Sequence, residues 1–353
     1  MSLHSVFRGP HGFFHPLSLL TGLFIFCCAS GCNQQNAGQY LRIQGKTMGT
    51  TYRITYFHPT ADTLQQQVDS LLNQYLRSVS TYEPKSTISR FNQNPRGVKM
   101  DTTFQKVYMA SREIYEATQG AFDPTVGPLV NLWGFGYKEL PKADTATVDS
   151  MRKLVGFDNL KVKGDSLLKP LPDMELDFSA IAKGYGVDLV AEMLEAKGIE
   201  HYFVEIGGEI RMAGKNPSGG KWRAGIERPK ENSQGLKAIL STTDQALATS
   251  GNYRNFYYRD GERYAHTIDP TSGYPVEHNL LSASVVASSC MYADAYATAF
   301  MVMGRGKTLN FLNNRPEIEA FLIYEDEAGK LITYSSPGIK RKIKSIEESA
   351  LIK

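Results

Sequence analysis

The stretch from residue 266 to 304 reads HTIDPTSGYPVEHN (266–279), LLSASVVASSC (280–290) and MYADAYATAFMVMG (291–304). These three parts predict a polar turn, a buried strand and a helix in direct succession. Asp294 and Thr298 are four residues apart, so they share one face of the helix. A carboxylate and a hydroxyl supply two hard oxygen ligands, which suit Mg²⁺ better than a softer metal. The spacing alone is more often that of a solvated helix face or a helix cap, so other segments must decide.

Composition bounds the fold and excludes one class of partner. The chain has 353 residues and 42% hydrophobic content, enough for a substantial core. Lys and Arg number 39 against 36 Asp and Glu, and no long basic run occurs, so we expect no nucleic-acid partner. The 19 Tyr and 31 Gly favour β-structure with many turns. Helix and strand signals alternate without regular βαβ spacing. The sequence therefore predicts a single α+β domain with mixed or antiparallel sheets flanked by helices.

Residues 1–31 have the layout of a secretory signal. Arg8 precedes an apolar run from 17 to 26, and the small residues 29–31 precede Cys32. This pattern resembles a bacterial lipobox, in which the cysteine is lipidated, although Ala29 stands where leucine is commoner. An uncleaved anchor from 13 to 30 is the alternative. We expect an exported protein that Cys32 anchors by lipid to a bacterial membrane, on the periplasmic side of the inner or outer membrane.

The cysteines agree with export without a disulfide. Cleavage before Cys32 removes Cys27 and Cys28, and lipidation of Cys32 leaves Cys290 alone in an apolar strand. An exported protein of this kind is stabilised by its core. Residues 32–40 are mainly polar and predict a tether, which leaves 41–353 as the folded domain.

The remaining elements follow from periodicity and turn signals. We expect helices at 62–76, 104–118, 145–154, 179–197 and 307–312, with a short one after 125. We expect strands at 52–56, 201–212, 222–226, 238–240 and 246–250, and hairpins over 157–168, 252–268 and 320–335. Ser179 is expected to be a helix N-cap, Gly207–Gly208 a bulge or a ligand contact inside one strand, and the basic segment 340–344 a solvated end.

The common catalytic signatures are missing from the sequence. It has no Gly-x-x-x-x-Gly-Lys-Ser/Thr loop, no Gly-x-Gly-x-x-Gly after a strand and no Gly-x-Ser-x-Gly elbow. His201, His266 and His278 lack zinc-ligand spacing. What remains is hard-cation and phosphate chemistry, with oxygen from Asp177 and Asp294 and a positive charge from Lys183 near a helix N-terminus. An ordinary capped helix with one surface lysine would give the same local signal.

Seven short motifs occur in order along the chain. They are TMGT (47–50), STY (80–82), GAFDP (120–124), DFSAIAKG (177–184), VEIGGE (204–209), HTIDP (266–270) and ADAYAT (293–298). Each is unspecific, but the ordered set resembles the ApbE family over about residues 48–304. The resemblance implies a T-fold-like α+β domain and a Mg²⁺-dependent FAD:protein FMN transferase, a class whose members are often exported lipoproteins.

The resemblance also implies the roles of individual residues. Positions that match FAD contacts are Met48, Tyr82, Ala121, Phe122, Asp123, Asp177, Lys183 and Ile268. The Mg²⁺ ligands would be the backbone carbonyl of Ala180 and the side chains of Asp294 and Thr298. Tyr82 is the aromatic residue expected near the isoalloxazine ring; its alternative reading is a packed edge-strand tyrosine.

The implied reaction joins FMN to another protein. A Thr or Ser hydroxyl of a partner flavoprotein attacks the FMN-side phosphorus of FAD, and AMP leaves. His266, on a strand that leads into the Asp269 turn, is the candidate for activating this hydroxyl, with Asp269 as the second catalytic candidate. A structural histidine is the other reading. The family's acceptor motif, similar to Asp-x-x-Ser-Gly-Ala-Thr, does not occur in this chain, so the acceptor is a separate protein.

Two rival functions remain open from sequence. One is Mg²⁺-dependent hydrolysis of FAD to FMN and AMP, which would use the same residues with water as the acceptor. The other is a lipid-anchored flavin-binding protein without turnover.

Overall fold

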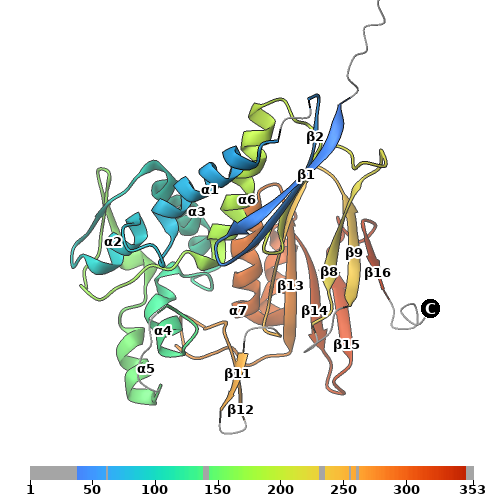
Figure 1. Ribbon diagram of the computed structural model, residues 1–353. Helices are drawn as coiled ribbons and strands as arrows, with labels where there is room; N and C mark the ends of the chain where they lie inside the picture. Colours follow the sequence, from blue (N-terminus) through green and yellow to red (C-terminus); the bar gives the residue numbers. More distant parts are fainter. Residues whose placement is uncertain are drawn as a thin grey trace, which may run out of the picture. The chain divides into compact units, whose positions relative to one another are not determined.

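A hairpin opens the described part of the chain (Figure 1). The computed structural model describes residues 38–60, 63–137, 143–229, 235–253, 256–259 and 262–346. Strands β1 (Gln39–Thr47) and β2 (Thr50–His58) pair antiparallel. Met48 and Gly49 form the turn with φ of 50° and 70°, the left-handed conformation that two-residue hairpin turns require. The predicted strand at 52–56 is confirmed, and the predicted loop at 47–50 is this turn.

The predicted N-terminal segments fall mostly outside the described residues. The signal segment, Cys32 and residues up to 37 lie outside the described residues. The tether predicted for 32–40 is too long, because Gln39 and Tyr40 already belong to β1. Residues Gly38–Lys353 form one compact unit. Within the described segments, the structure contains no helix that is both long and apolar enough to cross a membrane.

The hairpin continues into an eight-stranded sheet whose order is β1-β2-β6-β7-β10-β13-β14-β15. Each neighbouring pair is antiparallel. The added strands are β6 (Tyr202–Ile206), β7 (Glu209–Ala213), β10 (Gln245–Gly251), β13 (Leu280–Ala287), β14 (Glu319–Glu325) and β15 (Leu331–Ser335). The predicted α+β class with antiparallel sheets is confirmed.

The Gly207–Gly208 prediction needs correction. These glycines do not interrupt one strand but form the turn of the β6–β7 hairpin, with φ of 63° and 106°. Glycine at positive φ occurs both in one class of β-bulge and in tight hairpin turns, so the local sequence did not distinguish them.

Helices pack on one side of this sheet, and a small sheet lies on the other (Figure 1). The large helices are α1 (Gln65–Val79), α3 (Thr102–Ala117), α6 (Ser179–Ala196) and α7 (Cys290–Asn314). Shorter helices are α2 (Thr87–Gln93), η1 (Pro124–Val126), α4 (Gly127–Leu132), α5 (Thr145–Arg152) and η2 (Phe157–Asn159). The small sheets are β16 (Ile343–Ser345) with β9 (Leu236–Thr242) and β8 (Trp222–Glu227), β3 (Gly97–Lys99) with β5 (Ser166–Leu168) and β4 (Lys161–Lys163), and β11 (Phe256–Arg259) with β12 (Glu262–Ala265).

Several element predictions differ from the structure. Residues 87–93, for which the sequence predicted no element, form α2, and the Ser86 side chain caps this helix by accepting the N–H of Ser89. The basic segment 340–344 is not simply a solvated end, because it enters β16, which pairs with β9. The helix expected at 307–312 is the end of α7 after a kink at Gly304 (φ 69°, ψ 174°). Phe178, not Ser179, is the N-cap of α6.

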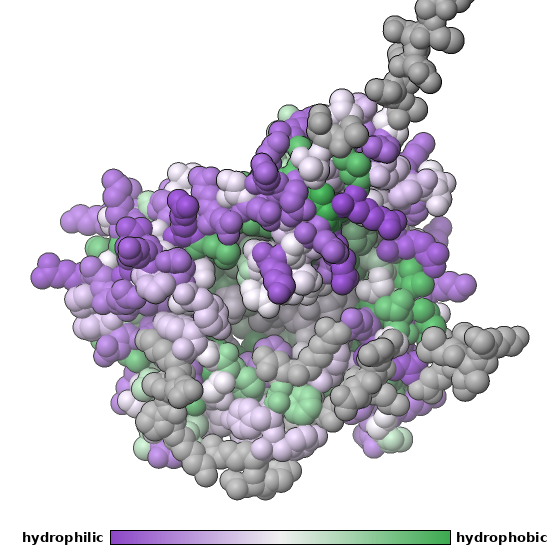
Figure 2. Space-filling view, viewed as in Figure 1, coloured by the Kyte–Doolittle hydropathy of each residue, from purple (hydrophilic) through white to green (hydrophobic). Residues whose placement is uncertain are grey.

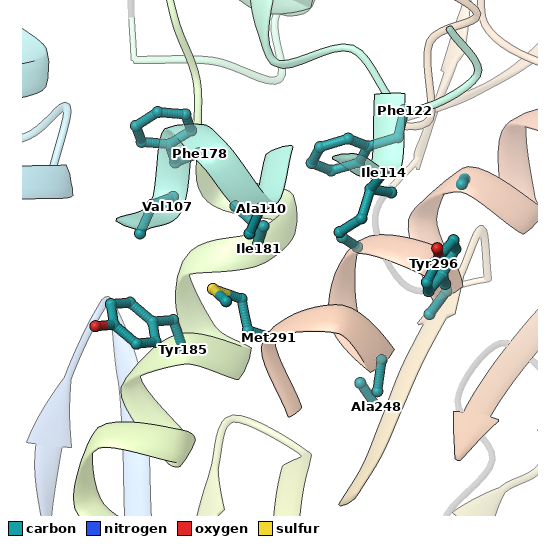
Figure 3. Close-up of a cluster of buried hydrophobic side chains, with 14 of the residues drawn as sticks. Val107, Ala110, Ile114, Phe122, Phe178, Ile181, Tyr185, Ala248, Met291 and Tyr296 are labelled. Carbon is teal, nitrogen blue, oxygen red and sulfur yellow. The ribbon is translucent and has the colours of Figure 1, made fainter. Parts of the chain in front are cut away.

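The core beneath the helices joins α3, α6 and α7 (Figure 3). Val107 of α3, Ile181 of α6 and Met291 of α7 are all buried in one cluster with Phe178. Helix α6 has buried residues around most of its circumference, as expected of a helix enclosed by other elements. Its position is therefore fixed by packing on several sides.

Gly184 allows α6 and α7 to approach closely. A Cβ at Gly184 would lie 2.2 Å from the carbonyl oxygen of Cys290 and 2.8 Å from Cβ of Asp294. Asp188 of α6 holds the start of α7, because its carboxylate accepts the N–H groups of Cys290 (3.0 Å) and Met291 (2.9 Å). A carboxylate at a helix N-terminus satisfies donors that lack a partner within the helix. Together these contacts place the first turns of α6 beside Asp294.

Candidate active site

A cavity of about 460 Å³ lies where α6, α7, β7 and β10 meet the segments 121–137 and 266–270. An adjoining cavity of about 570 Å³ shares Thr81, Tyr82, Asp177, Ser179 and Lys183 with it. The face shown in Figure 2 is recessed near its centre. Predicted site residues that line the first cavity are Tyr82, Ala121, Phe122, Asp123, Asp177, Ala180, Lys183, His266, Ile268, Asp294 and Thr298, and Met48 lines the second.

Lys183 lies between two buried carboxylates. Its Nζ is 3.8 Å from Oδ1 of Asp294 and 3.7 Å from Oε1 of Glu209. Burial of the ammonium opposes protonation, but the two carboxylates outweigh it and raise the pKa of Lys183. Burial raises the pKa of the Glu209 carboxyl to about 8, with a further rise from Asp294 and an opposing effect from Lys183. The lysine is therefore a permanent positive charge at the junction of the two cavities.

Asp294 and Thr298 face the cavity from one side of α7, as predicted. Oδ2 of Asp294 accepts the N–H of Gly184 at 2.9 Å, while Oγ1 of Thr298 lies 3.0 Å from Oγ of Ser250. Ala180 lines the same cavity from the first turn of α6. A carboxylate and a hydroxyl on the wall of one cavity, with the Ala180 backbone on the same wall, are hard-oxygen groups that fit Mg²⁺ when the substrate supplies further oxygens.

In the part of the chain that the structure describes, no metal site is built on nitrogen, sulphur or several carboxylates. Across the described segments, no group of three or more His, Cys, Asp or Glu side chains is arranged to hold a metal ion. The one described cysteine, Cys290, is buried and free. Within those segments, a cation at Asp294 would depend on hydroxyl, carbonyl and substrate oxygens, which is the usual environment of Mg²⁺ at phosphate substrates.

Two further aspartates shape the cavity wall. The Asp177 carboxylate accepts the N–H of Ser179 at 2.8 Å, and burial raises its pKa against the effect of that bond. Asp123 caps η1 by accepting from the N–H (2.7 Å) and the hydroxyl (2.5 Å) of Thr125, and burial raises its pKa. Asp123 therefore fixes the turn, and direct FAD contact by either carboxylate stays a prediction.

The two catalytic candidates are placed differently. His266 lines the cavity and lies edge-on to Phe135 at 6.3 Å, but it follows β12 and is not inside a strand as predicted. Asp269 is not among the cavity-lining residues, and its Oδ1 accepts the N–H of Thr271 at 2.9 Å. Its main-chain bonds to Gly273 and Tyr274 close the same turn. The geometry supports a turn-forming role for Asp269, and a catalytic role for it stays a prediction.

Aromatic side chains form another part of the wall. Tyr82 is 77% exposed, lies in a turn and contacts Tyr137 edge-on at 6.2 Å. Its alternative reading as a packed edge-strand tyrosine is therefore wrong. Phe135 stacks on Tyr257 at 5.2 Å and also lines the cavity. Such rings offer flat apolar faces to a planar ligand.

The sequence reasoning missed Glu209, Thr249 and Ser250 as cavity residues. Glu209 is only 4% exposed, and its motif position directly after two glycines was the available signal. Thr249 and Ser250 lie in β10, where nothing in the strand pattern distinguished them from ordinary sheet residues. Only the pairing of β10 with β7 and β13 brings them to the site.

The site and the fold agree with one family of transferases. The ApbE family model matches residues 48–322, so the chain belongs to the ApbE family. It is 39% identical to a protein named FAD:protein FMN transferase from Vibrio cholerae, over 90% of this chain and 97% of that protein. A protein of the same name from Escherichia coli K12 is 34% identical, over 93% of this chain and 97% of that protein.

Solved structures give the same result. The flavin transferase ApbE from Vibrio cholerae superposes with a TM-score of 0.80 at 39% identity, covering 86% of this chain and 99% of that one. The ApbE protein from Thermotoga maritima has a TM-score of 0.75 at 26% identity, covering 88% of this chain and all of that one. The resemblance proposed from the seven motifs is confirmed.

Proposed function

We propose that this chain is an FAD:protein FMN transferase, the activity for which its relatives are named. The observation that carries the proposal is the position of Lys183. Its charge lies where the two cavities join, beside Asp294, and Ser179 lines both cavities with it. A dinucleotide has two bulky ends and a pyrophosphate between them, so this junction suits the pyrophosphate and the cavities suit the ends.

The residues of the chain supply positioning and charge. Lys183 neutralises phosphate oxygens as a point charge, and the exposed ring of Tyr82 offers a stacking face for the flavin. Asp294, Thr298 and the Ala180 carbonyl would hold Mg²⁺, which when bound supplies further neutralisation of pyrophosphate charge. Catalysis of this type consists mainly of alignment and electrostatic stabilisation.

His266 is the residue that we assign to the proton. The acceptor Thr or Ser hydroxyl bonds to the FMN-side phosphorus, and the bond from that phosphorus to the bridging oxygen breaks. His266 takes the hydroxyl proton, and AMP leaves with the bridging oxygen. The position of His266 on the cavity wall supports this role.

We also propose export and lipid attachment through Cys32. The support is the signal-like segment 1–31 with small residues before Cys32. The test is fractionation of cells that express the wild type or Cys32→Ser. The proposal requires the wild type in membranes and the variant released from them.

The activity is tested with FAD, Mg²⁺ and a threonine-bearing flavoprotein domain. Mass spectrometry should show FMN attached to the domain, with one AMP released per attachment. Asp294→Ala should abolish transfer while much of the FAD affinity remains, whereas Asp149→Ala, on the surface of α5, should behave as wild type. Free FMN with unmodified acceptor would favour the hydrolase, and tight FAD binding without AMP would favour the flavin-binding protein.

A further inference from the structure

Lys183 forms no close hydrogen bond with either of its two acidic neighbours. Its distances to Glu209 and Asp294, 3.7 and 3.8 Å, both exceed the about 2.7–2.9 Å of a charge-assisted hydrogen bond. Glu209 is 4% exposed, and its Oε2 is buried without a hydrogen-bond partner in the described part of the chain. A buried carboxylate oxygen without a partner is costly, so its retention needs an explanation.

The β6–β7 turn brings this carboxylate to the lysine. Glu209 is the first residue of β7 and pairs with Ile206 across the Gly207–Gly208 turn. A Cβ at Gly207 would lie 2.8 Å from Cγ2 of Thr50 and 3.4 Å from Cδ of Lys183. The glycine therefore leaves room for the lysine stem to pass the turn. Glu209 meets the ammonium from the sheet, whereas Asp294 meets it from α7.

The two carboxylates have different tasks in the proposed function. Asp294 is the only carboxylate among the proposed ligands of the divalent cation. An ammonium ion paired with Asp294 would compete with that cation for the same oxygens. A second carboxylate, once it is ionised, attracts the ammonium and reduces this competition. Glu209 is the only other acidic residue within ion-pair distance of Lys183 among the described residues.

We propose that Glu209 is a positioning residue that draws the Lys183 ammonium away from Asp294 and so keeps the Asp294 carboxylate available to a divalent cation. The inference rests on the proposed function, because it presumes a cation at Asp294. Glu209 itself contacts neither the cation nor the reacting atoms in this scheme. Its effect therefore passes entirely through Lys183.

A double-mutant cycle on divalent-cation affinity tests this dependence. Mn²⁺ alone is titrated into the full chain without FAD, with calorimetric or paramagnetic detection, at pH 9, where the Glu209 carboxyl with its pKa of about 8 is ionised. The proteins are wild type, Glu209→Gln, Lys183→Met and the double variant. Glu209→Gln should weaken Mn²⁺ binding about 10-fold, equivalent to about 1.4 kcal/mol. In the Lys183→Met background the same substitution should change affinity less than about 2-fold.

The controls separate pairing from a general loss of negative charge. Glu205→Gln changes a carboxylate on β6 that contacts Arg53 and the N–H of Gly208, so it should leave Mn²⁺ affinity unchanged. Equal weakening by Glu209→Gln in both backgrounds would mean that Glu209 acts only as a distant anion and would overturn the proposal. So would an unchanged affinity in the single variant.

Three outcomes separate the inference from the proposed function and from a folding defect. If Glu209→Gln does not fold, Glu209→Asp keeps the charge but shortens its reach, and the proposal requires weaker Mn²⁺ binding in that variant than in wild type. If the wild type transfers FMN but binds no divalent cation, the metal assignment in the proposed function fails together with this inference. If the wild type binds Mn²⁺ and Glu209→Gln binds it equally, only the inference fails.

Discussion

The contact between α6 and α7 at Gly184 makes a quantitative prediction. In Gly184→Ala the new methyl would lie 2.2 Å from the carbonyl oxygen of Cys290, whereas carbon–oxygen contacts are normally about 3.3–3.6 Å. The atom in the way is a backbone oxygen, which cannot rotate aside as a side chain can, so α6 and α7 must separate by on the order of 1 Å. Overpacking of this kind costs about 1–3 kcal/mol, and we expect the upper end, about 3 kcal/mol. The better helix propensity of alanine offsets about 1 kcal/mol, which leaves a net loss of about 2 kcal/mol.

The same displacement should impair catalysis. Asp294 lies directly at this contact, 2.8 Å from the position of the added Cβ, and it also faces Lys183. A misplacement of about 1 Å can lower a rate about 100-fold, so we expect a loss of that order in FMN transfer. Denaturant unfolding measures the stability, and AMP release with an acceptor domain measures the activity.

Gly306→Ala is the matched control. Gly306 also lies in α7, but a Cβ at this position would have no neighbouring atom within 4 Å, so alanine there meets open space. It should keep full activity and gain up to about 1 kcal/mol of stability. The reasoning is refuted if Gly184→Ala is as stable as Gly306→Ala, or if it transfers FMN at more than half the wild-type rate.

Three further outcomes are expected. Asp188→Asn should lower the free energy of unfolding by about 3 kcal/mol in denaturant titration, because it removes the charge that caps α7 and pairs with Arg211; a loss below about 1 kcal/mol would contradict this. Tyr82→Ala should raise the Kd for FAD about 10-fold by calorimetry, whereas Tyr258→Ala should not; equal effects would remove the stacking role. Without divalent cations, the free energy of unfolding of the wild type minus that of Glu209→Gln should fall as pH rises from about 4.5 to 8. The folded-state pKa of Glu209, about 8, exceeds the ordinary value of 4.5, so the folded protein binds this proton more tightly than the unfolded chain does. A difference in the free energy of unfolding that does not change with pH would contradict this prediction.

The local pattern of apolar residues was enough to predict most of the helices and strands. The apolar spacing in α1 and α3 and the alternation in β2 predicted each element within a few residues of its observed bounds. Periodicity works there because each element buries one face, and the apolar residues of that face recur in the local sequence with the period of the helix or strand. It failed for α2, a short helix capped by Ser86, and for β16, which gains its backbone partners only from β9.

The site was also partly visible in the sequence. The motifs around Asp177–Gly184 and Ala293–Thr298 indicated an oxygen-rich phosphate and cation site, and the ordered motifs indicated the family. Residue types carry this information because carboxylates and hydroxyls are favoured side-chain ligands of hard cations, and ammonium groups neutralise phosphates. The sequence also predicted that His266 and Tyr82 belong to the site, and both side chains line the cavity.

Partners distant in the chain were decided only by tertiary structure. The sequence did not show that Glu209 faces Lys183, that Gly184 permits the close approach of α6 to α7, or that Asp269 accepts the N–H of Thr271 in a turn. These facts depend on which strands pair and on how closely two helices pack. Periodicity describes one element at a time, whereas a contact between α6, α7 and β7 depends on all three together. The sequence by itself therefore determined the elements and the kind of chemistry, and the packing determined which side chains act on one another.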